Sequence, residues 1–240
     1  ADGTVSVVEG TSVSQSLGSP SVYASSSTLY GYSTFDSTNN KVVITYRDIG
    51  NTNKGTAVVG TVSGTSISFG TPVVFSTAEQ YDVAPVVFDS NSNKIVIFFT
   101  NSSYYGTAIV GTVSGTSISF GTPVVFDSGI FILEDASAAF DSSSNKVVVA
   151  YKRGAQGHSR VGTVSGTSIS FGTNVQFESG TAEDSAMVFD SNASKIVIVY
   201  SDVNNSRYGT AVVGTVSGTS ISFGSSVVFE SADIREPHVA

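Results

Sequence analysis

Gly-Thr-Val-Ser-Gly-Thr-Ser-Ile-Ser-Phe-Gly occurs four times without a substitution, at residues 60–70, 111–121, 162–172 and 214–224. The copies start at residues 60, 111, 162 and 214, so consecutive copies lie 51, 51 and 52 residues apart. A period of about 50 residues is typical of four-stranded propeller blades and is longer than most helical solenoid repeats. This undecapeptide therefore predicts the architecture of the chain.

One repeat contains four runs of strand length, each rich in β-branched and aromatic residues. In the second repeat they are residues 84–88, 94–99, 107–113 and 117–125. The breaks between them carry turn residues, as in Asp89-Ser90-Asn91-Ser92-Asn93 and Ser114-Gly115-Thr116. No stretch keeps apolar residues at helical spacing over three turns, so we expect antiparallel four-stranded units and essentially no helix.

Repeated meanders bury their faces either by radial packing in a β-propeller or by stacking in a β-solenoid. Solenoid coils are usually shorter, so the repeat length favours the propeller. We expect an all-β, single β-propeller domain over residues 1–240, with four-stranded antiparallel blades at 29–75, 82–126, 135–177 and 185–229.

Both termini resemble parts of a further blade. Residues 3–8 and 11–23 match a third strand and an outer strand, and residues 236–239 match the inner strand near Pro85. Joining them would give a fifth blade from residues 1–23 and 235–240, which would cover exposed strand edges. A counterpart of the strand at residues 94–99 is present at neither terminus. The alternative is that the chain is a piece of a longer repeat array.

The two ends of the blades differ in character. One end carries the Ser-Gly-Thr-Ser turn and a repeated Asp and Lys, at Asp36 and Lys41, Asp89 and Lys94, Asp141 and Lys146, and Asp190 and Lys195. This end is predicted to be structural. The loops at the other end vary in length and content, which is typical of binding loops on a fixed framework.

The variable loops gather aromatic, cationic and acidic residues. Exposed tyrosines can stack on a sugar ring or on a partner side chain. We predict a ligand-binding surface made of Tyr30, Tyr32, Arg47, Asp48, Tyr81, Asp82, Tyr104, Tyr105, Arg153, His158, Arg160, Asp202, Arg207 and Tyr208. The alternative is that loops without a structural role have simply diverged.

The composition excludes several classes of partner and site. A net charge of -8 disfavours a nucleic acid or an anionic membrane surface as partner, and no apolar run could insert into a membrane. With no cysteine and two histidines, a zinc site is not expected. We expect no cofactor, although the loops at residues 48–53 and 202–206 offer oxygen ligands that suit Ca²⁺.

The sequence holds no nucleophile elbow, phosphate-binding glycine loop or dinucleotide fingerprint. Carboxylates are numerous on the variable loops, so a glycoside hydrolase stays open as a third hypothesis. The Asp or Glu that follows the outer strand at residues 127, 178 and 230 recurs at blade spacing, which indicates a local turn role.

The repeat resembles sialidase-like and lectin-like propeller repeats in residues 85–89, 94–99 and 114–120. The hairpin at residues 114–120 lies where that family carries its Asp box, but it lacks the Asp and the Trp. The family's arginine cluster has no counterpart here, so we expect no sialidase activity. The amino-acid sequence of the repeat also resembles tandem repeats of tail-fibre and surface proteins of phages and bacteria. This resemblance implies an exposed recognition or structural role.

These observations predict a non-enzymatic, lectin-like propeller at an extracellular or virion surface. Its partner would be a glycan or another surface polymer, bound through the variable loops like an adhesin. The alternative is a structural repeat module of a virion fibre or cell-surface filament, in which the loops contact neighbouring subunits.

Overall fold

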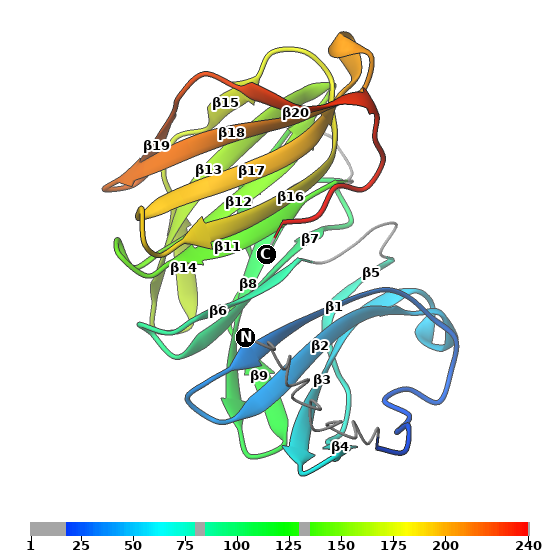
Figure 1. Cartoon of the computed structure of the whole chain (residues 1–240). Coiled ribbons are helices and arrows are strands. Elements are labelled where there is room, and N and C mark those ends of the chain that lie inside the picture. The colour runs from blue at the N-terminus through cyan, green and yellow to red at the C-terminus, as the bar shows by residue number, and fades with distance from the viewer. Residues whose placement is uncertain (1–17, 80–84, 130–134, 240) are drawn as a thin grey trace, which may run out of the picture.

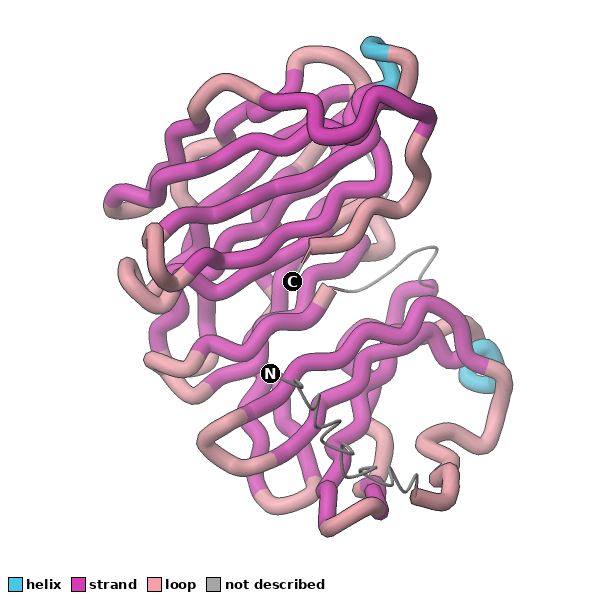
Figure 2. Tube along the Cα trace, in the orientation of Figure 1, coloured by secondary structure: helices cyan, strands magenta, loops and turns pink. Residues whose placement is uncertain are grey.

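The computed structural model describes residues 18–79, 85–129 and 135–239, and in this part of the chain nearly all regular structure is β-strand. The strands form four antiparallel sheets, one per repeat, which we number 1 to 4 (Figures 1 and 2). Two 3-10 turns, η1 (Ile49–Asn51) and η2 (Val203–Asn205), are the helical elements of the described residues.

Sheet 1 consists of β1 (Thr28–Asp36), β2 (Lys41–Asp48), β3 (Lys54–Ser63), β4 (Ser66–Phe69) and β5 (Val73–Glu79). Sheet 2 consists of β6 (Val86–Asp89), β7 (Lys94–Thr100), β8 (Gly106–Ser114), β9 (Ser117–Phe120) and β10 (Val124–Asp127). Sheet 3 consists of β11 (Ser137–Asp141), β12 (Lys146–Arg153), β13 (Gln156–Ser165), β14 (Ser168–Phe171) and β15 (Val175–Glu178). Sheet 4 consists of β16 (Ala182–Asp190), β17 (Lys195–Asp202), β18 (Tyr208–Ser217), β19 (Ser220–Phe223) and β20 (Val227–Asp233).

All four sheets share one topology. The first strand pairs with the second, the second with the third, and the third with both the fourth and the fifth. The prediction of an all-β chain with one antiparallel meander per repeat is confirmed. The arrangement as a propeller and the number of blades stay predictions.

The predicted single outer strand over residues 117–125 is wrong. Two strands, β9 and β10, pair with opposite halves of β8 and are separated at Gly121-Thr122-Pro123. The Gly121 N–H still donates to the Val110 carbonyl (2.9 Å), whereas Pro123 has no N–H to donate to the ladder. The same interruption occurs in every repeat.

The turn between the first and second strands is held by an aspartate. The Asp36 carboxylate accepts the backbone N–H groups of Thr38 and Asn39, each at 3.0 Å. Asp89, Asp141 and Asp190 hold the same turn in the other sheets. Burial alone would raise the pKa of Asp141, but hydrogen bonds from Ser143 and Ser144 outweigh it and lower that pKa. These contacts give the repeated aspartates a structural role.

Neighbouring sheets pack face to face, and the inner strands β1, β6, β11 and β16 adjoin one another in that order. One hydrophobic core lies between each pair of consecutive sheets, and Val96, Val110, Val147 and Val149 are fully buried members of the core between sheets 2 and 3.

An aromatic trio recurs where one sheet meets the next. A ring at the end of the outer strand contacts a ring from the second strand and a ring from the outer hairpin of the following sheet. The ring centroids lie 5.5 and 6.2 Å apart for Phe75 with Phe99 and Phe120, 5.3 and 5.3 Å for Phe126 with Tyr151 and Phe171, and 5.5 and 5.8 Å for Phe177 with Tyr200 and Phe223. Tyr23, from the segment before sheet 1, makes the same contacts with Tyr46 and Phe69 at 5.3 and 6.0 Å.

The last glycine of the undecapeptide packs against the next repeat. A Cβ atom on Gly121 would lie 1.9 Å from the Thr167 carbonyl oxygen, so any side chain there would collide with backbone. Gly18, Gly70 and Gly172 meet Thr65, Thr116 and Thr219 in the same way. Gly224, by contrast, would have its nearest neighbour, the Val213 carbonyl, at 3.9 Å.

Gly18, the first described residue, lies beside sheet 1, where it approaches Thr65. From β20 the chain runs back toward the inner strands (Figure 1). The predicted closing blade, residues 1–23 and 235–240, falls partly outside the described residues, and residues 18–23 form no strand. Among the described residues, no helix is long and apolar enough to cross a membrane.

We predict that Gly121→Ala destabilises the protein, whereas Gly224→Ala at the equivalent position of the last repeat is nearly neutral. The new methyl group at residue 121 must displace the backbone of residue 167, which costs about 1–3 kcal/mol. At residue 224 the change is expected to stay within about 0.5 kcal/mol. Urea denaturation of both variants checks this, and equal destabilisation would contradict it.

Candidate functional site

A pocket of about 750 Å³ lies where the inner strands of the four sheets meet, and we call it the central pocket. Each sheet contributes the beginning of its inner strand, and the C-terminal segment adds a fifth part. The lining consists of Tyr30, Tyr32 and Ser33, Pro85 and Val86, residues 135–138, residues 184–187, and Glu236, Pro237 and His238.

The rim of the central pocket has an unusual backbone. Tyr30, Asp135, Asp184 and Glu236 have positive φ angles of 54°, 57°, 53° and 50°. They occupy one repeat position, two residues before the lining residues Tyr32, Ser137, Ala186 and His238. The ladders of β1 and β16 shift register at this point. A side chain held in this region costs about 1–3 kcal/mol, and such residues can cluster at ligand sites. In the described residues they also occur in turns between strands, as at Asn40 and Asn93.

The rim is acidic but partly paired. Lys152 Nζ lies 3.8 Å from Asp135 Oδ2 and 3.6 Å from Glu183 Oε1. Arg207 also donates to Glu183, and this hydrogen bond is the main reason that the pKa of Glu183 is lowered. Glu183 therefore stays ionised, and the pocket mouth favours neutral or cationic ligands over anions.

Serines tie the rim segments of sheets 3 and 4 together. The Ser185 hydroxyl donates to the backbone carbonyl of Asp135, and the Ser137 and Ser185 hydroxyl oxygens lie 3.4 Å apart. The backbone segments that carry Asp135 and Asp184 are thus linked to each other without a ligand.

Of the residues predicted to bind ligand, Tyr30 and Tyr32 line the central pocket, and each ring is partly exposed. Tyr81 and Asp82 lie outside the described residues.

Arg47 and Asp48 are the last two residues of β2, apart from the pocket lining. Arg47 Nε donates to Asn53 Oδ1 (3.0 Å), and Arg47 Nη2 lies 3.8 Å from Glu79 Oε1. Asp48 accepts the hydroxyl of Ser26 at 2.6 Å. Both side chains thus hold local loop structure.

Tyr104 and Tyr105 belong to the loop before β8, also apart from the pocket lining. The Tyr104 ring is exposed, and the side chain of Tyr105 is half-buried. Their ligand-binding role stays a prediction.

Asp202, Arg207 and Tyr208 surround the turn η2 of sheet 4. Asp202 accepts the backbone N–H of Asn205 (3.2 Å), and burial, followed by the charge of Glu178, raises the pKa of Asp202. Arg207 reaches Glu183 on the pocket rim, whereas Tyr208 pairs with Asp202 in the strand ladder.

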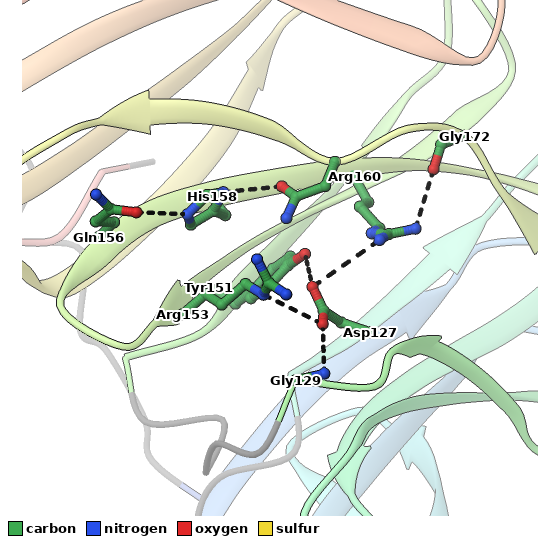
Figure 3. A network of polar contacts seen from close by, with 9 residues as sticks. Asp127, Gly129, Tyr151, Arg153, Gln156, His158, Arg160 and Gly172 are labelled. Carbon is green, nitrogen blue, oxygen red and sulfur yellow. Dashed lines mark hydrogen bonds and ion pairs between the residues drawn. The ribbon is translucent and has the colours of Figure 1, made fainter.

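Arg153 and Arg160 converge on one buried carboxylate between sheets 2 and 3 (Figure 3). Asp127 accepts the Tyr151 hydroxyl (2.9 Å) and the Gly129 N–H (2.8 Å). Arg153 Nε and Arg160 Nη2 lie 3.4 and 3.9 Å from its two oxygens. Burial is the main cause that raises the pKa of Tyr151, so its hydroxyl keeps the proton that it donates.

His158 lies beside this network, and its ring stacks on that of Tyr151 with the centroids 6.3 Å apart. Its Nδ1 lies 2.9 Å from Asn174 Oδ1 and its Nε2 lies 3.4 Å from Gln156 Oε1. The position of His158 is held by Thr56, Thr107 and Thr210 in the other repeats, and that of Arg160 by Val58, Ile109 and Val212. Those residues are buried. In the third repeat, Arg160 and its partner Asp127 therefore lie as charged side chains in the interface between sheets 2 and 3.

The acidic residue after the outer strand has a role in two interfaces. Glu178 repeats the contacts of Asp127, since it accepts the Tyr200 hydroxyl (2.9 Å) and the Gly180 N–H (2.6 Å). The N–H contact gives the local turn role that the spacing indicates. The tyrosine contact adds a link between sheets that the spacing does not predict.

Metal ligands are not grouped in the described part of the chain, where no cluster of three or more His, Cys, Asp or Glu side chains could hold an ion. The two loops with oxygen ligands use their aspartates for the contacts of Asp48 and Asp202 described above.

The predicted ligand residues left out Asp135, Asp184, Glu236 and His238, which line the central pocket. Alignment of the repeats could have found them, because three of them share the position of Tyr30. No protein-family model matches the chain, and no curated protein matches it.

We predict that the free energy of unfolding decreases as the pH is lowered below about 6.5, and that His158 causes part of this decrease. Burial is the main cause that lowers the pKa of His158 from 6.5, so the unfolded chain takes up this proton more readily. His158→Thr, which restores the residue of the other repeats, is expected to remove this part of the loss. Unfolding free energies between pH 7.5 and about pH 5 check it, with His238→Thr as the matched control. An unchanged slope in the His158 variant would refute the prediction.

Proposed function

We propose that the chain is a five-bladed β-propeller whose last blade is closed by both termini. Four observations support this ring. The four sheets share one topology, their inner strands adjoin in order, and Glu236–His238 line the central pocket beside the inner strands. Gly18 and Tyr23 contact sheet 1 as an outer strand of a preceding sheet would.

The proposed function of this ring is binding of carbohydrate or another polar surface polymer, without catalysis. The observation that carries the proposal is the central pocket, where the partly exposed rings of Tyr30 and Tyr32 lie with Asp135, Asp184 and Glu236 on one rim. Aromatic faces and hydrogen-bonding carboxylates are the groups that bind sugar rings and their hydroxyls.

The charge of the rim defines the ligand class. Carboxylates accept hydroxyl protons well but repel acidic sugars, so the proposed ligand is neutral or cationic. The left-handed backbone at the rim supports binding as well, because residues held in strained conformations cluster at ligand sites.

We propose binding in preference to glycoside hydrolysis because carboxylates at the rim are paired with Lys152 and Arg207. Hydrolysis requires one protonated carboxyl group as general acid. Lys152 Nζ instead lies 3.8 Å from Asp135 Oδ2 and 3.6 Å from Glu183 Oε1, and the pKa of Glu183 is lowered, mainly by the hydrogen bond from Arg207.

The proposed setting is an extracellular or virion surface, where a neutral polymer would be met. The second candidate is a structural module of a fibre or surface filament. It is favoured by the exposed apolar residues on sheets 1 and 4, among them Phe35, Val62 and Phe229, which could contact further subunits.

We predict that Tyr32→Ala weakens glycan binding about tenfold, because the stacking surface in the pocket is lost. A glycan array identifies the ligand class, and calorimetry with the best ligand measures the variant. Tyr104→Ala removes an exposed tyrosine outside the pocket, and unchanged binding in this variant would assign the glycan to the central pocket instead of the loop before β8.

Repeating the array in EDTA tests the Ca²⁺ alternative, in which binding would be lost on chelation. Absence of binding to every glycan class and surface polymer would overturn the proposed function. Equal losses of glycan affinity in Tyr32→Ala and Tyr104→Ala would show that the central pocket is not the binding site.

A further inference from the structure

Two of the acidic residues that line the central pocket have no ion-pair partner in the described part of the chain. Asp184 and Glu236 belong to no ion pair there, whereas Asp135 lies 3.8 Å from Lys152 Nζ. The described lining residues include acids but no lysine or arginine. The pocket therefore presents carboxylates that the cations of the chain leave available to a ligand.

The repeats explain why Asp184 lacks the partner that Asp135 has. Lys152 and Ser201 hold the same position of β12 and β17, each directly after the tyrosine of its strand. Asp135 and Asp184 also hold one position, with φ angles of 57° and 53°. A lysine ammonium thus reaches the acid of sheet 3, whereas the short serine side chain brings no charge to the acid of sheet 4.

Ser201 shows the same substitution from the other side. Its side chain is fully buried, and within the described residues its hydroxyl makes no hydrogen bond. Buried hydroxyl groups nearly always have a partner, so this one is an exception. Arg207 does not replace the lysine, because it donates its hydrogen bond to Glu183 and acts on Asp184 only through longer-range charge. Sheet 4 thus has the acid of the pair in sheet 3 but not its cation.

We propose that the central pocket binds a sugar that carries a protonated amino group, as in a polymer of glucosamine. The ammonium pairs with Asp184, in the way that a lysine ammonium pairs with the acid of sheet 3, and Glu236 adds negative charge to the same pocket. The sugar ring packs on Tyr30 and Tyr32. This inference rests on the proposed function and names the class of sugar within it.

The pocket suits an amino sugar better than a basic peptide. Its volume of about 750 Å³ lies within the range of small-molecule sites. Tyr30 is 44% and Tyr32 is 38% exposed, so both rings are available to pack on a sugar ring and to attract a cation. Ser33 also lines the pocket and offers a hydroxyl group for hydrogen bonds. A lysine side chain has the ammonium but neither a ring nor hydroxyl groups to use these contacts.

The test compares oligomers of glucosamine with oligomers of N-acetylglucosamine of the same length. Calorimetry with the whole chain is carried out at a pH at which the amino groups are protonated. The glucosamine oligomer is expected to bind about tenfold more tightly, because acetylation removes the charge and keeps the sugar ring. The difference should shrink as the salt concentration rises, since ion pairs near the surface are screened.

Asp184→Asn is expected to remove most of this preference, while the N-acetylglucosamine oligomer keeps its affinity. Ser201→Lys, which restores the residue of sheet 3, should have the same effect because the chain then supplies its own ammonium. Glu230→Gln removes one negative charge from β20, outside the pocket lining, and is the matched control that should keep the preference. Circular dichroism shows whether each variant is folded, and Asp184→Asn tests the site even where Ser201→Lys does not fold.

Equal affinities for the two oligomers overturn the amino-sugar proposal and leave glycan binding intact. A preference that Asp184→Asn does not reduce overturns it as well, because the ammonium would then bind elsewhere. Tighter binding of an oligolysine of the same charge would identify a basic polypeptide as the ligand and also overturn it. Absence of binding to every glycan overturns the proposed function itself, so the two failures give different results.

Discussion

The structure depends on a contact between repeats in which backbone meets backbone. The last glycine of one undecapeptide packs on the Gly-Thr-Ser turn of the next, as Gly121 does on Thr167, with no room for a Cβ atom. The first three copies offer their glycine to the following repeat, where a change would affect an interface. Gly224 in the last copy makes no such contact, so the contact explains the glycine in the first three copies and not in the fourth. The aromatic trio lies beside this contact and buries its rings between the same sheets.

The repeat made most of the fold predictable. Turn residues and β-branched runs recur at one spacing, so strand type and pairing can be inferred four times from the same pattern. The interruption of the outer strand could not be inferred in this way. Gly121 looks like a strand residue after Phe120, and its role depends on Thr167, which is distant in the sequence. Local pattern carries no information about such a contact.

The structure brings only part of the predicted ligand residues to the central pocket, for a related reason. Tyr30 and Tyr32 line the central pocket, as an aromatic binding surface would require. Arg153 and Arg160 instead pair with Asp127, whose carboxylate comes from the preceding repeat, and His158 packs beside them on Tyr151. A charged residue in a variable region looks the same in the sequence whether it faces a ligand or a buried partner. Only comparison of repeats, in which valine or threonine stands at the same position, indicates burial.

The repeated frame separates the residues that hold neighbouring sheets together from those that could select a ligand. Each rim position of the central pocket has one backbone conformation, whether the residue is Tyr30, Asp135, Asp184 or Glu236. The side chain can therefore differ between repeats without a change in strand pairing or in the contact between sheets. The network of Asp127 illustrates the opposite case, because a charge placed within an interface needs a partner from the neighbouring sheet. Variation is tolerated at the rim for this physical reason, and specificity can diverge there while the undecapeptide stays constant.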